Sequence, residues 1–293
     1  MNKNSVIGTI ILLLAAIIWG FAFVAQSIGM DYVSPFTFNG VRLLIGALVL
    51  LPLAIASKYK INKKTLLSGL ICGLFVFAAT NLQQIGLKYT TVGKAGFITT
   101  CYIIMVPIAG IFFKKKTGVF TWIAVVIAAV GLYLLSFKPN EGLLPSKGDI
   151  TVFLCAVAFT GHIWSVDKLA AGINCVVLSC MQFLVSGVLS LIAAFIFESP
   201  AMGSILDAWL PILYAGVLSS GVAYTFQIIG QQRLKPTIAS LLMSLESVFA
   251  VLGGWLILRQ SLSARELIGC ALMFAAIIIV QVVPVKKTVG QAI

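Results

Sequence analysis

The segment VIGTIILLLAAIIWGFAFVAQSI occupies residues 6–28 and contains no charged side chain. A helix of this length, rising 1.5 Å per residue, reaches across the ~30 Å hydrocarbon core of a bilayer. The segment is too long for the apolar region of a signal peptide and lacks a clear small-residue cleavage site, so we interpret it as a membrane-spanning helix. Similar apolar runs recur along the whole chain, which predicts an all-α integral membrane protein.

The composition agrees with a membrane protein. Of 293 residues, 60% are hydrophobic and only 10% are charged, whereas soluble domains carry about 25% charged residues. The net charge of +12 is explained by basic loops that face the cytoplasm. No basic stretch is interleaved with aromatic residues as in a nucleic-acid surface. The expected partners are therefore the lipid bilayer and a small molecule, and not nucleic acid.

Hydropathy predicts ten spans: 6–28, 36–56, 66–87, 91–113, 118–137, 149–168, 174–197, 208–230, 237–258 and 264–284. With the N-terminus inside, 13 Lys and Arg residues fall on the inner side and six on the outer side. This asymmetry predicts that both termini are cytoplasmic. We expect the chain to lie in the plasma membrane, that is, the cell inner membrane. Pro107 predicts a kink in the fourth span.

An internal repeat relates the two halves of the chain. With a shift of 145 residues, IIWGF at 17–21 falls on HIWSV at 162–166, and YTTVGKAGFITTCY at 89–102 falls on LKPTIASLLMSLES at 234–247. The halves, residues 1–140 and 146–288, contain five spans each, so the second half enters the membrane from the opposite side. Inverted repeats of this kind place a transport site near the midplane between the halves. A duplication without mechanistic meaning is the alternative.

Glu246 is isolated in SLLMSLESVFAVL, residues 240–252, where nearly every other side chain is apolar or small. Nine residues into its span it would lie ~13 Å deep, close to the midplane. An ionised carboxylate there costs ~2.5–3.5 kcal/mol and needs a partner, cavity water or a proton. We expect Glu246 to line a central site and to change protonation during a transport cycle. A structural carboxylate bonded to a neighbouring helix is the alternative.

Polar side chains recur at helical spacing in two further spans. Asn81 and Gln84 share a face of the third span, with Gln83 beside them, and Tyr224 and Gln227 share a face of the eighth. Amides exposed to lipid are costly, so these faces should point into the bundle. They would line either a pore or a seam between helices.

Four other residues have two interpretations each. Trp19 and Trp164 are equivalent in the repeat, and they would either anchor the chain at the interface or flank a central site. His162, the only histidine, would either relay protons or act as a neutral hydrogen-bonding residue. Arg42 is expected near the outer face, where its long side chain could reach the surface; its role would be either structural or functional.

Motifs for chemistry are missing. GKAGF at 93–97 lacks the first glycine of a P-loop and the Ser or Thr that follows its lysine. The spans contain too few His, Asp and Glu residues for a hydrolytic site, and the six cysteines form no CxxC pair. We therefore expect no enzyme activity, no cofactor and no metal site.

Four stretches are distinctive in this order: IIWGFAFVAQ (17–26), NGVRLLIGALVLLPL (39–53), GKAGFITTCYIIMVP (93–107) and ASLLMSLESVFAVLGGWLILRQSLSARELIGCALMFAAIII (239–279). Together they resemble the EamA family of the drug/metabolite transporter superfamily over nearly the whole chain. The resemblance implies two EamA repeats forming ten helices around a central cavity, in a secondary exporter. Two departures stand out. Ser247 follows Glu246 where the family usually has Pro, and Arg259 and Gln260 replace its usual Gly-Glu pair.

We therefore expect a secondary transporter, and more narrowly an exporter of small metabolites such as amino acids or related amphipathic solutes. It would work by alternating access, with protons as the candidate coupling ion at Glu246. The candidate substrate-binding residues are Glu246, Tyr224, Gln227, Asn81, Gln84, Trp19, Trp164 and His162. A non-transporting sensor or assembly protein built on the same bundle is the alternative function.

Overall fold

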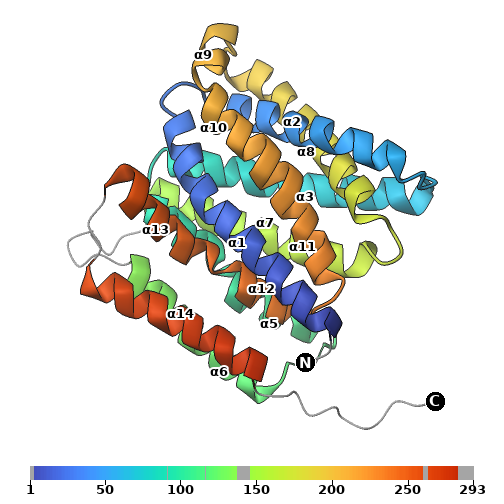
Figure 1. Ribbon diagram of the computed structural model, residues 1–293. Coiled ribbons are helices and arrows are strands. Elements are labelled where there is room, and N and C mark those ends of the chain that lie inside the picture. The colour runs from blue at the N-terminus through green and yellow to red at the C-terminus, as the bar shows by residue number, and fades with distance from the viewer. Residues whose placement is uncertain (1–2, 91, 116, 137–145, 260–262, 283–293) are drawn as a thin grey trace.

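The computed structural model describes residues 3–90, 92–115, 117–136, 146–259 and 263–282, and every regular element in these ranges is a helix (Figure 1). Up to residue 136 the elements are α1 (Lys3–Gly29), α2 (Pro35–Ala56), α3 (Lys63–Leu87), α4 (Val92–Thr100), α5 (Tyr102–Phe112) and α6 (Val119–Ser136). From residue 147 they are α7 (Lys147–Leu169), α8 (Cys175–Phe197), α9 (Met202–Asp207), α10 (Trp209–Leu213), the π-helix η1 (Tyr214–Ala223), α11 (Tyr224–Gln231), α12 (Pro236–Met243), α13 (Glu246–Leu258) and α14 (Ala264–Val282). Four of the basic residues counted above lie outside the described ranges, namely Lys116, Lys138, Lys286 and Lys287, and so does Gln260.

Eight helical stretches in the described ranges are long and apolar enough to cross a membrane. Five of them are the single helices α1, α2, α3, α7 and α8, and three are compound stretches at Val92–Phe112, Trp209–Gln231 and Pro236–Ile257. These eight correspond to eight of the ten predicted spans. The fifth and tenth predicted spans coincide with the helices α6 and α14. The chain is thus a multi-pass membrane protein.

The outward faces of these helices are apolar. Large hydrophobic side chains such as Leu48, Ile55, Ile111, Phe195 and Phe197 are exposed on them. In water such a continuous apolar surface would drive aggregation, whereas lipid tails solvate it without cost. The bilayer therefore acts as the outer solvent of this fold.

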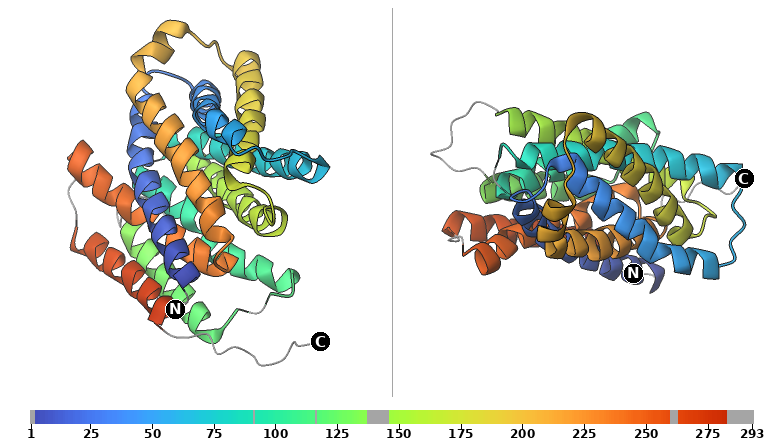
Figure 2. Two further views of the ribbon diagram at one scale, coloured as in Figure 1. Left: turned by 45° about the vertical axis from the view of Figure 1, so that its right-hand side comes forward. Right: turned by 90° about the horizontal axis from the view of Figure 1, so that it is seen from above.

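Helices far apart in sequence pack in pairs. The helix α2 packs along α8 at one edge of the bundle, and α6 packs along α14 at the opposite edge (Figures 1 and 2). Between these pairs, α3 packs against α7, and α1 packs against η1, α11 and α13. The central helices are therefore contributed by both halves of the chain.

Side chains from the opposite half support helix starts at one end of the bundle. The carboxylate of Glu198, at the end of α8, accepts hydrogen bonds from the backbone N–H groups of Phe36 and Thr37 in the first turn of α2. A negative charge there satisfies free N–H groups and the positive end of the helix dipole. At the same end, Lys94 Nζ lies 2.8 Å from Asp149 Oδ2, which ties α4 to α7.

Two predicted spans are interrupted rather than continuous. The fourth breaks at Cys101, between α4 and α5, and the ninth breaks at Ser244 and Leu245, immediately before Glu246. At both breaks the backbone makes i→i−3 bonds, as in Ile104 N to Cys101 O and Ser247 N to Ser244 O. Pro107, where the sequence predicts a kink, lies inside α5, shortly after the tight turn at Cys101.

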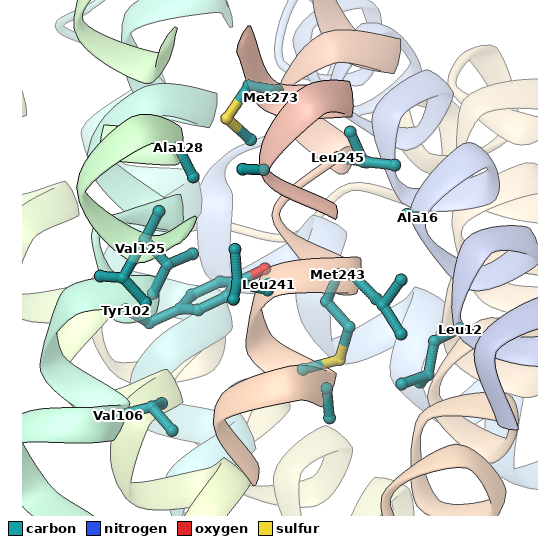
Figure 3. Close-up of a cluster of buried hydrophobic side chains, with 14 of the residues drawn as sticks. Leu12, Ala16, Tyr102, Val106, Val125, Ala128, Leu241, Met243, Leu245 and Met273 are labelled. Carbon is teal, nitrogen blue, oxygen red and sulfur yellow. The ribbon is translucent and has the colours of Figure 1, made fainter. Parts of the chain in front are cut away.

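Buried apolar side chains from seven helices form a cluster beside these breaks (Figure 3). Its labelled members are Leu12, Ala16, Tyr102, Val106, Val125, Ala128, Leu241, Met243, Leu245 and Met273. Tyr102 has a polar tip, which reaches from α5 toward α12 and α13 (Figure 3). The cluster leads directly to the polar centre of the bundle.

Close approach of α1 and α13 depends on Gly20. A methyl group added at Gly20 would lie 2.7 Å from the carbonyl carbon of Phe249 and 2.8 Å from the nitrogen of Ala250. Neither backbone atom can move away without displacing α13. Small residues at such contacts are the usual means of close helix packing in membranes.

We predict that Gly20→Ala destabilises the protein by about 1–3 kcal/mol, because the added methyl group overpacks the contact between α1 and α13. The measurement is unfolding of the purified protein in detergent. The control is Gly203→Ala, where an added methyl group meets no atom within 4 Å. Equal stability of the two variants would contradict this role for Gly20.

Candidate functional site

A small cavity lies between the helices of the two halves. It is lined by Trp19, Phe23, Gln26, Arg42, Gln83, Tyr102, Phe159, Ile163, Ser219, Tyr224, Gln227, Met243 and Glu246. The volume open to the centre of a water molecule is about 30 Å³, enough for about two waters. We call this space the central cavity. Its wall combines aromatic and aliphatic side chains with one guanidinium, one carboxyl group and three amides.

Glu246 is at the point where the two interrupted spans meet. It is the first residue of α13, and Tyr102 is the first residue of α5. The Tyr102 hydroxyl group donates a hydrogen bond of 3.0 Å to Glu246 Oε1. The Glu246 side chain is 6% exposed, and within the described ranges its Oε2 atom has no hydrogen-bond partner. One carboxyl oxygen is therefore held by the protein, the other has no partner among the described residues, and the side chain lines the central cavity.

The turn before Glu246 is stabilised by serine side chains. Ser240, Ser244 and Ser247 each donate a hydrogen bond to the carbonyl oxygen three residues earlier, at 2.8–2.9 Å. Such local bonds satisfy backbone acceptors that the break in the helix would otherwise leave unpaired in an apolar interior. The hydroxyl groups of this stripe thus support the interruption of the helix.

Trp19 and Tyr224 form an aromatic wall of the central cavity. Their rings pack edge to face with centroids 4.9 Å apart, a favourable geometry for aromatic pairs. The indole N–H of Trp19 donates to the carbonyl oxygen of Ser219 at 3.3 Å, within the π-helix η1. A π-helix widens the backbone and often occurs at functional sites, because it leaves carbonyl groups accessible. Trp19 is therefore a cavity residue and not an anchor at the interface.

His162 lies behind the cavity wall, in a row of buried polar side chains. Its Nε2 atom is 3.0 Å from Gln182 Oε1, and its Nδ1 atom is 3.5 Å from Gln227 Nε2. This arrangement places the ring proton on Nε2, so that Nδ1 accepts from Gln227. In a doubly protonated ring Nδ1 would carry a hydrogen and would face the amide N–H of Gln227, so that two donors would repel each other. The geometry favours a neutral, hydrogen-bonding histidine that positions Gln227.

Asn81 also lies behind the cavity. It donates to Ser190 Oγ at 2.7 Å and accepts from Asn39 Nδ2 at 3.1 Å. Asn39 in turn accepts from Arg42 Nε at 2.7 Å. Asn81 therefore belongs to a seam between α2, α3 and α8 and reaches the central cavity only through Asn39 and Arg42.

Arg42 corrects an expectation from the sequence. Instead of extending to the outer surface, its side chain is 2% exposed and lines the central cavity. Depth counted along a single helix placed it near the interface, but the packing of α2 against α8 and η1 covers it.

On α3 the cavity residue is Gln83 and not Gln84. Gln83 lines the central cavity and donates to Thr99 Oγ1 at 3.2 Å. Gln84 is fully buried and donates to the backbone oxygen of Gln26 at 3.2 Å. Two amides of the cavity wall have a buried oxygen without a hydrogen-bond partner in the described ranges, namely Gln26 Oε1 and Gln227 Oε1. Such groups are costly unless a water or a ligand binds them.

A wider space opens at one end of the bundle. It offers about 790 Å³ and is bordered by the loop after α5, the end of α7 and the segment between α11 and α12. We call it the vestibule. Its charged lining residues are Lys114, Lys115, Asp167, Arg233 and Lys235. Lys115 Nζ lies 3.5 Å from Asp167 Oδ2, so the basic residues are in excess.

Trp164 borders the vestibule rather than the central cavity. Its indole N–H donates to the carbonyl oxygen of Val106 at 3.1 Å, and its ring packs on Phe113. The neighbouring residue Ile163 lines the central cavity. Gln231 of the vestibule likewise accepts from Gln227 of the cavity at 3.4 Å. A thin layer of side chains therefore separates the two spaces.

The structure brings together four of the eight predicted binding residues, Trp19, Tyr224, Gln227 and Glu246, around the central cavity. Sequence reasoning did not assign Tyr102, Phe159 or Met243 to the site. For Tyr102 a signal was present, because the repeat places it opposite Ser247, beside Glu246. In the described ranges, no group of three His, Cys, Asp or Glu side chains could hold a metal ion.

Comparisons with known proteins agree with this architecture. An uncharacterized transporter of Archaeoglobus fulgidus is 30% identical over 275 residues, covering 92% of this chain and 84% of that protein. The uncharacterized inner membrane transporter YedA of Escherichia coli K12 is 24% identical over 290 residues, covering 94% and 92% of the two chains. A protein crystal structure has a TM-score of 0.79 at 19% identity, covering 93% of this chain and 96% of that chain, so the fold is shared.

The match to a family is also extensive. Residues 6–137 and 146–282 match the EamA-like transporter family. These two stretches include nearly all of the helices described above. The chain belongs to the EamA-like transporter family.

Proposed function

We propose that this protein is a secondary transporter that exports small amphipathic solutes, such as amino acids, by alternating access coupled to protons. The observation that carries the proposal is the central cavity, where a carboxyl group lies among aromatic and amide side chains inside an apolar bundle. Polar groups in a membrane interior are expensive and mark the paths of substrates and ions. No constellation for catalysis competes with this interpretation in the described residues.

We further propose that ten helices form two inverted repeats, residues 1–140 and 146–288. Two matched stretches at 6–137 and 146–282 support this division. The packing also supports it. In the repeat, α7 corresponds to α1, and the stretch formed by η1 and α11 corresponds to α3. The contact of α3 with α7 in the structure is matched by the contact of η1 and α11 with α1. The interruptions before Tyr102 and Glu246 occupy corresponding places in the two halves. Discontinuous helices in corresponding positions are typical of transporter binding sites.

The two spaces suggest one state of an alternating cycle. The vestibule is wide, whereas the central cavity is too small for a metabolite. At the opposite end, Asp149 accepts from Thr90 and pairs with Lys94, which holds α4 against α7. In this state a solute would reach the centre from the vestibule after the thin layer around Gln227 and Gln231 separates. The vestibule side is cytoplasmic in the proposed topology, as export requires.

Glu246 provides a plausible coupling group. A proton on its free oxygen removes the cost of a charge in the apolar interior, and a bound cationic group would do the same. The proton and the substrate would then compete for the same carboxyl group. Because the protein would carry one or the other, export of the substrate would be coupled to entry of the proton.

We predict that Glu246→Gln folds but loses pH-driven uphill transport while retaining exchange. The amide keeps nearly the same volume and can still accept the hydrogen bond from Tyr102, yet it cannot bind a proton. The measurement is solute flux into liposomes as a function of pH. The control is Glu266→Gln, since Glu266 lies at the start of α14, away from the central cavity. An unchanged pH profile in Glu246→Gln would refute coupling at this residue.

We predict that Tyr224→Phe reduces transport by about 2- to 10-fold and leaves stability nearly unchanged. Its hydroxyl group makes no hydrogen bond within the described ranges, although the residue lines the cavity, so its partner would be the solute. Flux and thermal unfolding are measured on the same preparation. Tyr32→Phe is the matched control because Tyr32 is exposed. A loss of stability as large as the loss of flux would indicate a packing role instead.

We predict cytoplasmic termini and cytoplasmic loops at residues 57–62 and 113–118. In a variant without its six native cysteines, cysteines at positions 60 and 115 should resist an impermeant thiol reagent in intact cells. A cysteine at position 32, in the loop after α1, should react. Labelling at 60 or 115 would reverse the proposed orientation.

A non-transporting sensor or assembly protein would show a different result. Such a protein could bind a solute in the central cavity, but it would produce no solute-dependent flux in liposomes.

A further inference from the structure

Arg42 and Glu246 lie in the wall of the same cavity without forming an ion pair. We propose that they bind the two ends of a zwitterion, with Arg42 holding a carboxylate and Glu246 holding an ammonium group. This assignment rests on the proposed transport function and deepens it. It makes Arg42 the residue that selects for the anionic group of the solute.

The Arg42 guanidinium is oriented from behind. Its Nε atom donates to Asn39 Oδ1, and Asn39 is fixed by donating to the carbonyl oxygen of Thr80 and to Asn81 Oδ1. Among the described residues, the two terminal amino groups of Arg42 have no hydrogen-bond partner. A planar pair of such donors fits a carboxylate in a bidentate manner. An almost completely buried guanidinium that lines the cavity and keeps donors without a partner among the described residues is suited to bind an anion.

Glu246 has the complementary arrangement. Tyr102 donates a hydrogen bond to Oε1, while Oε2 has no hydrogen-bond partner among the described residues, and the Glu246 side chain lines the cavity. No nitrogen of Arg42 comes within 4.0 Å of a Glu246 oxygen, the limit for an ion pair. Asn39 and Tyr102 thus tether the two charged groups, which do not form an ion pair with each other. Two tethered opposite charges in an apolar interior are each left for a ligand to compensate.

The charge pair specifies the chemical class of the ligand. A solute with only a cationic group would leave Arg42 uncompensated, and a solute with only an anionic group would leave Glu246 uncompensated unless it takes up a proton. An α-amino acid carries both groups on one carbon atom. The remaining wall contains Phe23, Phe159, Ile163 and Met243, which suits an apolar side chain. The cavity must widen on binding, and the thin layer toward the vestibule is the place where it can.

The test is a binding series on the purified full-length protein in lipid nanodiscs, measured by titration calorimetry. The twenty standard amino acids are titrated first. The tightest binder is then compared with its amide, which lacks the anionic group, and with its deaminated acid, which lacks the cationic group. We expect each loss to weaken binding by about tenfold or more.

Variants assign the two ends. In Arg42→Gln, the amino acid and its amide should bind equally, whereas Arg42→Lys should retain part of the difference. In Glu246→Gln, the amino acid and its deaminated acid should bind equally. Arg259→Gln, which removes an exposed arginine charge at the end of α13, should leave both ratios unchanged.

Several outcomes would overturn the assignment. It is wrong if no amino acid binds, if the amide binds to the wild-type protein as tightly as the amino acid, or if Arg42→Gln keeps the wild-type ratio. Should Arg42→Gln fail to fold, the ratios measured on the wild-type protein decide. If the protein transports solute into liposomes but Arg42→Gln keeps the wild-type ratio of the affinities for the amino acid and its amide, the transport proposal stands and only the role of Arg42 is refuted. Zwitterion binding without any flux would refute transport alone.

Discussion

The hydrogen bond between Tyr102 and Glu246 is the interaction around which the centre of this protein is organised. A carboxyl group in a lipid-solvated bundle needs a partner, because the surrounding lipid offers no water to compensate for its burial. Both residues begin a helix after an interruption, and each interruption comes from a different half of the chain. The bond therefore ties two broken helices together at the one place where their backbones turn.

The polar residues around this bond form two layers. The inner layer, which includes Trp19, Arg42, Tyr224 and Gln227, faces the cavity. The outer layer holds the inner one in place, as Asn39 does for Arg42 and His162 does for Gln227. Such support fixes the orientation of the inner side chains, because a side chain free to rotate would seek another partner. Residues that contact no solute can therefore still determine how one is recognised.

The same arrangement links recognition to movement. The central cavity is narrow while the vestibule is wide, and only a few side chains separate them. Small residues such as Gly20 let α1 approach α13 closely, so the helices that carry Trp19 and Glu246 are in backbone contact. A shift of either helix would alter the cavity wall directly. Binding and opening would thus involve the same contacts.

The sequence by itself determined the membrane class and most of the spans, and it singled out Glu246, which lines the central cavity. These follow from local properties: apolar length, basic loops and a carboxylate in an apolar run. Helical spacing also identified Tyr224 and Gln227, and the repeat identified Trp19. It did not separate these cavity residues from Asn81, Gln84, Trp164 and His162, which face inward but lie behind the wall or beside the vestibule.

Only the tertiary structure decided which polar residue meets which. Arg42 illustrates the reason, since counting along α2 places it near the surface while packing against α8 and η1 buries it beside the cavity. The interruptions at Cys101 and Leu245 are likewise invisible to hydropathy, because the residues at these turns are small or apolar like those of the helices around them. Periodicity along one helix states which face points inward, whereas the neighbour that this face meets depends on how all the helices pack together.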